Sequence, residues 1–189
     1  MSRSSPATAA PLTPRIHHRG HGGFTLLEAM ITIAILAVVL AIAIPSFKSL
    51  TASRAVNSQL SALAGALRLT RAEAIKHGAR VSICPNMACS GNQWKDGWII
   101  FLDPTGTGAV TSANVLHQQP AFSNSGGIYF CGGKNRIAFK GNGLAGGGQS
   151  SFSIMPPLPS TDALYIKASQ KLTVNSTGNT YATKEANPC

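Results

Sequence analysis

The most strongly apolar part of the chain extends from Phe24 to Ile44, where 18 of 21 residues are apolar and only Glu28 is charged. A helix of that length measures about 31 Å, which matches the hydrocarbon core of a bilayer. A carboxylate inside such a helix is costly in lipid, so it marks a functional candidate. The pattern therefore predicts a membrane-spanning helix that carries a functional acid near its start.

A second apolar pattern, with helical spacing, follows Pro45. Its positions share one face of an amphipathic helix, and they are Val56, Leu60, Leu63 and Leu67. Gly78 is a suitable stop, because glycine adopts the left-handed conformation that ends many helices. We expect one long helix over about residues 24–77, transmembrane over 24–44 and amphipathic over 45–77, with a helix break at Pro45.

From residue 78 to 189 the apolar positions alternate with a period close to two, which is typical of β-strands. Turn-rich loops separate these short segments, and no helical pattern lies between them. The chain is therefore predicted to have an α+β fold, with the long N-terminal helix packed on antiparallel β-sheets. The expected strands are Arg80–Cys84, Trp98–Leu102, Val115–Gln119, Ile128–Cys131, Arg136–Lys140, Phe152–Met155, Leu164–Lys167 and Lys171–Val174.

Two simpler interpretations of the apolar segment compete. A cleaved secretory signal has a shorter apolar core; Ala41–Ala43 offers it a cleavage site, but the run is too long and contains Glu28. A single-pass anchor fits the length, and the basic residues before it place the N-terminus in the cytoplasm. Neither interpretation accounts for Glu28.

The junction before the apolar run carries a processing motif, Gly22-Gly23-Phe24-Thr25-Leu26-Leu27-Glu28. It resembles the class III signal of type IV pilins and type II secretion pseudopilins. The resemblance implies that prepilin peptidase cuts after Gly23 and that the new amino group of Phe24 is methylated. It also implies that Glu28 neutralises the terminus of a neighbouring subunit when the apolar helices bundle in a filament.

A second resemblance covers the start of the predicted β domain. The segments 71–76 (RAEAIK), 81–84 (VSIC) and 94–103 (WKDGWIIFLD) are similar to the GspH/FimT family of minor pilins and pseudopilins. The resemblance implies a pilin-like fold. It also implies a structural subunit for the assembly, tip or initiation complex of a type IV pilus or a type II secretion pseudopilus.

The charge of the chain changes with processing. There are 16 Lys+Arg against 6 Asp+Glu, a formal net charge of +10. Three of the arginines lie in residues 1–23, the predicted leader, so the remaining 166 residues keep 13 basic residues against 6 acidic ones. This leader is longer than is usual for the signal, which a misplaced start codon or a genuinely long leader would explain. The remaining excess keeps DNA or a membrane surface as candidate partners.

The chain has four cysteines, Cys84, Cys89, Cys131 and Cys189, and an exported domain favours disulfides. Four thiols allow three connectivities. The Cys84–Cys89 loop is compact enough to close on itself, leaving Cys131 with Cys189, a bridge worth about 4 kcal/mol on the chain-entropy model. A zinc site is the alternative, although this spacing is poor for metal ligands.

DNA binding is the alternative function. Some FimT-like minor pilins bind DNA during natural transformation, in part through a Gly-Arg-x-Arg motif. The corresponding stretch here keeps Gly178 but has Asn179 and Tyr181 in place of both arginines. The candidate DNA contacts are therefore the lysines Lys167, Lys171 and Lys184, which are dispersed in sequence.

Catalysis is not supported by any motif in the sequence. There is no G-x-S-x-G, H-E-x-x-H or P-loop pattern, and six acids leave few candidates for paired-carboxylate chemistry. We therefore expect a non-enzymatic protein without cofactor or metal. Its expected partners are prepilin peptidase, other pilins or pseudopilins and the inner membrane. The N-terminus would be cytoplasmic and residues 78–189 would form a periplasmic or extracellular domain, which later joins the pilus or pseudopilus.

Overall fold

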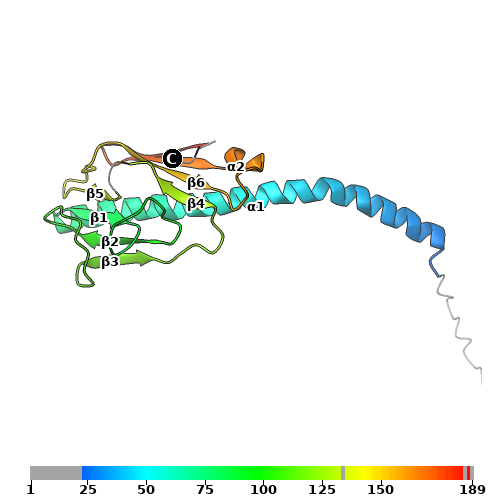
Figure 1. The fold of residues 1–189 in the computed structure, drawn as a ribbon, viewed down its shortest axis with the longest axis horizontal. Helices are drawn as coiled ribbons and strands as arrows, with labels where there is room; N and C mark the ends of the chain where they lie inside the picture. Colours follow the sequence, from blue (N-terminus) through cyan, green and yellow to red (C-terminus); the bar gives the residue numbers. More distant parts are fainter. Residues whose placement is uncertain (1–22, 133–134, 185–186, 188–189) are drawn as a thin grey trace, which may run out of the picture. The chain divides into compact units, whose positions relative to one another are not determined.

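The computed structural model describes residues 23–132, 135–184 and 187 (Figure 1). The chain divides into two units, Met1–Ala41 and Ile42–Cys189. The first unit contains the apolar beginning of helix α1, which extends over Leu26–His77. The second unit contains the rest of α1 and all the strands of the described residues.

Helix α1 ends where the sequence predicts. Gly78 has a φ of 60°, so it adopts the left-handed conformation that is unfavourable for other residues. The backbone N–H of Gly78 donates to the carbonyl of Ile75 at 3.2 Å, and that of Ala79 donates to the carbonyl of Ala74 at 3.3 Å. These two hydrogen bonds form a Schellman motif, which satisfies carbonyls at the end of the helix. The predicted stop at Gly78 is confirmed.

The predicted helix break at Pro45 is not present, because α1 continues through it to His77. Proline lacks a backbone N–H, so one helical hydrogen bond is missing at this point. The turns that follow bury one face, beginning with Ala52 and Val56 at 2% and 0% exposure. Burial of this face stabilises the continuing helix and offsets the missing hydrogen bond.

The strands form two antiparallel sheets of four, in the order β3-β2-β1-β5 and β4-β6-β7-β8. The chain builds most of the first sheet, crosses to the second with β4, and returns to the first with β5 before β6 to β8 complete the second. The strands of the first sheet are β1 Val81–Cys84, β2 Trp98–Leu102, β3 Val115–Gln119 and β5 Ile137–Phe139. Those of the second are β4 Gly127–Phe130, β6 Ser150–Met155, β7 Gln170–Val174 and β8 Thr180–Lys184.

Two predictions about the end of the chain require correction. The predicted strand Leu164–Lys167 is wrong, because these residues form the short helix α2. Asp162 initiates this turn: its side chain accepts from the N–H of Leu164 at 2.9 Å and its carbonyl accepts from the N–H of Tyr165, also at 2.9 Å. Strand β8 was not predicted from the sequence, because it is a polar edge strand whose residues are mostly exposed.

The core lies where the second half of α1 meets both sheets. Val56, Leu63 and Leu67 of the predicted helical face are 0–1% exposed. They belong to one cluster with residues of both sheets, and its aromatic members are Trp94, Trp98, Phe130, Phe139 and Phe152. The ring of Trp94 contacts that of Phe152 edge to face, with centroids 4.8 Å apart. The helix therefore contributes to the same core as both sheets.

Strand β2 is buried on both faces, which explains its continuous apolar sequence. Trp98 and Ile100 belong to the main core with α1. Ile99 and Phe101 point the other way and form a second cluster with Cys84. The alternation of this strand therefore predicts correctly that one set of side chains faces the helix.

Shortening a side chain on the buried face of α1 is expected to destabilise the domain. Leu63→Ala should lower the free energy of unfolding by about 2–5 kcal/mol, because it removes apolar contacts and leaves a cavity. Urea unfolding of the full chain in detergent micelles, followed by the fluorescence of the buried Trp94 and Trp98, measures this change. Leu69→Ala is the matched control, since Leu69 is 37% exposed on the same helix. Equal losses in the two variants would contradict the assigned core.

Candidate assembly site

The processing junction lies directly before the first turn of α1. Phe24 is 80% exposed and precedes the helix. The backbone N–H of Glu28 donates to Oγ1 of Thr25 at 3.2 Å, so Thr25 is the N-cap residue. Of the predicted leader, residues 1–22 lie outside the described residues. A new terminus at Phe24 would be one residue from the cap of the helix.

The role of Thr25 as the residue that caps α1 was not predicted from the sequence. Thr25-Leu26-Leu27-Glu28 has the spacing of a capping box, in which Ser or Thr precedes Glu by three positions. That signal was present in the sequence beside the processing motif. The cap defines the start of the helix and therefore the position of Glu28 in its first turn.

The carboxylate of Glu28 is exposed and has no recorded hydrogen bond or ion pair within the described part of the chain. It lies in the first turn of α1, where the helix dipole favours a negative charge. The site therefore presents an acid at the start of an apolar helix. An incoming cation is the group that such an acid would bind.

The apolar part of α1 is exposed all round its circumference. An 18-residue window of the helix has a mean hydropathy of 2.7, and none of that window is buried. The exposed side chains include Leu26, Leu27, Ile31, Ile35, Val38 and Ile42. A helix that is apolar on every face requires an apolar surrounding, which is a membrane or other apolar helices.

Exposed apolar side chains are also present on α1 after Pro45, within the second unit. The side chain of Phe47 is 70% exposed, whereas Phe139 and Phe152 in the β domain are fully buried. A groove of about 360 Å³ next to it is lined by residues of α1 and of the β6–α2 loop, among them Ile44, Phe47, Pro157 and Leu158. The apolar surface of the helix is therefore extended by the β6–α2 loop.

An ion pair joins α1 to this loop. Nζ of Lys48 donates to the carboxylate of Asp162, and the N–H of Leu164 donates to the same carboxylate at 2.9 Å. The hydrogen bond from Lys48, together with that from Leu164, holds the pKa of Asp162 below its usual value of 3.8. The pair fixes the start of α2 to the helix.

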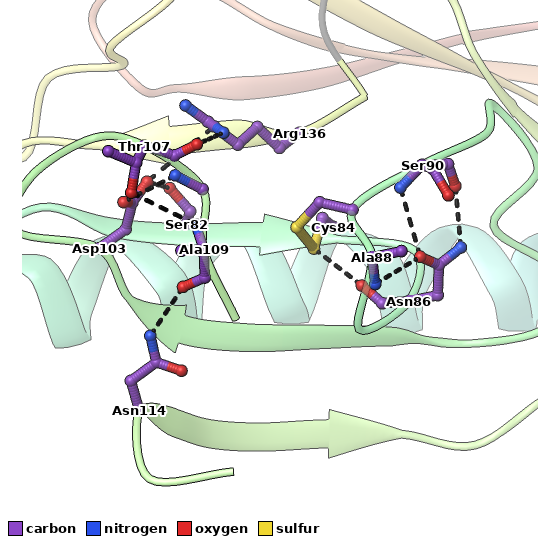
Figure 2. The surroundings of a disulfide bond; sticks show 12 residues. Ser82, Cys84, Asn86, Ala88, Ser90, Asp103, Thr107, Ala109, Asn114 and Arg136 are labelled. Carbon is purple, nitrogen blue, oxygen red and sulfur yellow. Dashed lines mark hydrogen bonds and ion pairs between the residues drawn. A yellow bond between two sulfur atoms is a disulfide. The ribbon is translucent and has the colours of Figure 1, made fainter. Parts of the chain in front are cut away.

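The structure contains the Cys84–Cys89 disulfide, with Cα atoms 5.1 Å apart, at the end of β1 (Figure 2). The side chain of Asn86 organises the loop inside it, because its Oδ1 accepts from the N–H of Ala88 at 3.0 Å. Cys131 is not free. Its predicted partner, Cys189, lies outside the described residues, so that pairing stays a prediction.

The zinc alternative is not supported by these contacts. Cys84 and Cys89 are bonded to each other, so neither is available as a thiolate ligand. Within residues 23–132, 135–184 and 187, no group of three His, Cys, Asp or Glu side chains is placed to hold a metal ion.

The three candidate DNA-contacting lysines do not share one face. Lys171 pairs with Thr183, and Lys184 pairs with Gln170 in the neighbouring register position. Paired residues share a face and successive residues alternate, so Lys171 and Lys184 lie on opposite faces of the sheet. Lys167 lies apart from both strands, in the last turn of α2. The register therefore provides no common surface for the three lysines.

Comparison with known proteins agrees with this architecture. Two crystal structures of the type IV minor pilin FimU of Pseudomonas aeruginosa, in space groups P65 and P21, are similar to the chain. The first has a TM-score of 0.53 and 16% sequence identity and covers 68% of this chain and 93% of that chain. The second has a TM-score of 0.55 and 17% identity, and covers 69% and 89%. No curated protein matches the chain.

The fold and the apolar helix thus define a membrane-anchored pilin with a C-terminal domain. Residues 18–44 match the prokaryotic N-terminal methylation motif, and residues 59–178 match the family described as type II transport protein GspH. The chain belongs to the GspH family. It is a minor pilin or pseudopilin, a structural subunit, as the resemblance predicts.

The link between Lys48 and Asp162 predicts a pH dependence of stability. Because the pKa of Asp162 is lowered in the folded state, its contribution is present above about pH 3.8 and is lost as the pH falls through the lowered value. Asp162→Asn should remove this contribution. The loss of stability between pH 5 and about pH 2 should therefore be shallower in the variant, as measured by urea unfolding at each pH.

Asp96→Asn is the control for this measurement, because it removes an exposed carboxylate that has no recorded ion pair within the described ranges. An acid profile of Asp162→Asn identical to that of the unmodified chain would contradict the assigned role of the pair.

Proposed function

We propose that this protein is cut after Gly23, methylated at Phe24, and then held in the inner membrane until it joins a filament. Its N-terminus is cytoplasmic and its β domain is periplasmic at that stage. The partners are prepilin peptidase and other major or minor subunits of a type IV pilus or a type II secretion pseudopilus. The match of residues 18–44 to the N-terminal methylation motif supports the processing steps.

The observation that carries the assembly proposal is the exposed carboxylate of Glu28, which has no partner among the described residues, at the start of an exposed apolar helix. Cleavage after Gly23 creates a cationic amino group at Phe24. In a bundle of apolar helices, an unpaired charge is costly, whereas a pair of opposite charges in contact is much less so. Glu28 of one subunit is therefore proposed to bind the amino group of its neighbour.

In this arrangement, apolar contacts give the helices their affinity for one another, and the charge pair sets the register between them. The apolar side chains of α1 allow many lateral positions, because dispersion contacts are not directional. The charge pair is satisfied only when the acid and the amino group are brought together. The proposed role of Glu28 is therefore to select one position of the helix along its neighbours.

Processing predicts the N-terminus of the mature chain. N-terminal sequencing and intact mass of the protein from membranes should give a chain that begins at Phe24 and carries one methyl group on its amino nitrogen. A chain that begins at Met1, or that begins after Ala43, would contradict the proposed processing. The first result would favour a plain anchor, and the second a cleaved secretory signal.

Assembly should depend on the charge of Glu28. Glu28→Gln keeps the size of the side chain but leaves the neighbouring amino group unpaired, so incorporation into filaments should fall at least tenfold, consistent with the cost of breaking a buried pair. Sheared filaments quantified by immunoblot against the membrane fraction measure this ratio. Asp96→Asn is the control, because it removes an exposed acid of the β domain that has no ion pair among the described residues. Normal incorporation of Glu28→Gln would overturn the assembly role.

A further inference from the structure

A cavity of about 380 Å³ lies on the β domain, and its described lining includes no residue of α1 or of the assembly site. Its volume is within the range of about 300–1,000 Å³ that ligand sites occupy. Strands β4, β5 and β6 contribute to its wall, together with the residue that precedes β1 and a glycine-rich segment. The residues that matter for its chemistry are Arg80, Arg136, Ala138, Ala145, Gln149 and Ser150.

The guanidinium of Arg136 is fixed in position by neutral groups. Its Nη1 donates to the carbonyl of Thr107 at 2.9 Å (Figure 2). Its Nη2 donates to the carbonyl of Gly106 at 2.6 Å. Its Nε lies 4.0 Å from Oδ2 of Asp103. Two of these three contacts are to neutral carbonyl oxygens, and the third is a long ion pair with a buried carboxylate.

Two glycines make room for both guanidinium groups. A Cβ added at Gly106 would collide with Nη1 of Arg80, and one added at Gly108 would collide with Nη1 of Arg136. Both glycines also have positive φ values, 73° and 76°. The loop between β2 and β3 is therefore shaped so that the two arginines rest against bare backbone.

The cavity keeps an excess of positive charge. Arg80 has no recorded hydrogen bond or ion pair of its side chain within the described residues. The nearby acid is Asp103, which is 2% exposed and already accepts from Oγ of Ser82 at 2.8 Å and from the N–H of Gly108 at 3.1 Å. The described residues that line the cavity include no Asp or Glu. Among the described residues, the guanidinium of Arg136 therefore has one carboxylate near it, which has other partners, and that of Arg80 has none.

The lining identifies the kind of anion. Ala138 and Ala145, both partly exposed, give the lining an apolar part beside the polar groups Gln149 and Ser150. A free inorganic anion would leave that apolar part in contact with water, whereas a carboxylate attached to a hydrocarbon chain would cover it. The planar fork of arginine also matches the two oxygens of a carboxylate.

We propose that this cavity binds an acidic side chain of a protein segment, with Arg80 and Arg136 on the carboxylate and Ala138 and Ala145 on its hydrocarbon part. The ligand is an acidic peptide with an apolar residue next to the acid. The cavity includes no residue of the assembly site. The proposed peptide binding is therefore independent of the proposed role of Glu28.

Peptide binding to the mature chain in detergent micelles tests this assignment. The probe is an acetylated and amidated alanyl-leucyl-glutamyl-alanine peptide, and its comparison is the same peptide with glutamine in place of glutamate. Backbone amide NMR shifts should move for Gly106, Gly146 and Gly148 on titration with the glutamyl peptide, with at least tenfold weaker binding of the glutaminyl peptide. The affinity should also fall as salt is raised, because charge attraction is screened.

Variants distinguish peptide binding at the cavity from a general effect of the positive charge of the protein. Arg80→Gln should weaken binding of the glutamyl peptide at least tenfold, and Arg80→Lys should restore only part of the loss, because lysine keeps the charge but not the fork. Arg54→Gln is the matched control, since Arg54 is an exposed arginine of α1 outside the cavity. Unchanged tryptophan fluorescence shows that each variant is folded.

Several outcomes overturn the proposal. These are no saturable binding of the glutamyl peptide, equal binding of both peptides, shifts confined to residues away from the cavity, or equal losses in Arg80→Gln and Arg54→Gln. Inorganic phosphate that binds more tightly than the glutamyl peptide, with the same dependence on Arg80, would assign the cavity to a phosphate instead. Because none of these measurements involves filament assembly, failure here leaves the role of Glu28 unaffected.

Discussion

The burial of one face of α1 against both sheets is the contact on which the rest of the structure depends. Val56, Leu63 and Leu67 are nearly inaccessible to solvent and share a core with residues of each sheet. Among the described residues, no strand of one sheet pairs with a strand of the other. Backbone hydrogen bonds join the β1–β2 connection to β4, as from the N–H of Trp94 to the carbonyl of Ile128 at 2.8 Å. Apolar contact with the helix adds to these links and also stabilises the helix beyond Pro45.

The two parts of α1 meet different physical requirements with one continuous backbone. The second part is amphipathic, because one side contacts the core and the other contacts water. The first part is apolar on all sides and unburied, so its stable surrounding is lipid or other helices. A charged group is costly in either surrounding, and this cost gives the exposed Glu28 its proposed selectivity. The same carboxylate in water would contribute little, because exposed ion pairs are weak.

In the β domain, the positions of the cationic side chains depend on one loop and on the strand register. Arg136 is held by carbonyls of the β2–β3 loop, Asp103 is satisfied by Ser82 and the N–H of Gly108, and Arg80 rests against Gly106. Backbone carbonyls of one loop thus hold Arg136, and a glycine of the same loop leaves room for Arg80. By contrast, the β7–β8 register separates Lys171 and Lys184 onto opposite faces, although both are basic and close in the chain. The arrangement of the cations, rather than their number, distinguishes a candidate binding cavity from a solvated surface.

The sequence by itself determined the features that depend on local spacing. It specified the apolar run, the amphipathic face, the stop at Gly78, the processing motif, the compact disulfide loop and seven of the strands to within about two residues, because period and turn chemistry are local properties. Tertiary structure decided the rest. Leu164–Lys167 became a helix because Asp162 is fixed beside Lys48 of α1, and the polar strand β8 forms because β7 offers it an edge. Arg80 and Arg136 are 56 positions apart, and only the packing of the β2–β3 loop against β5 brings them to one cavity. The two arginines are brought together by contacts between residues that are far apart in the sequence. A local sequence pattern does not contain that information.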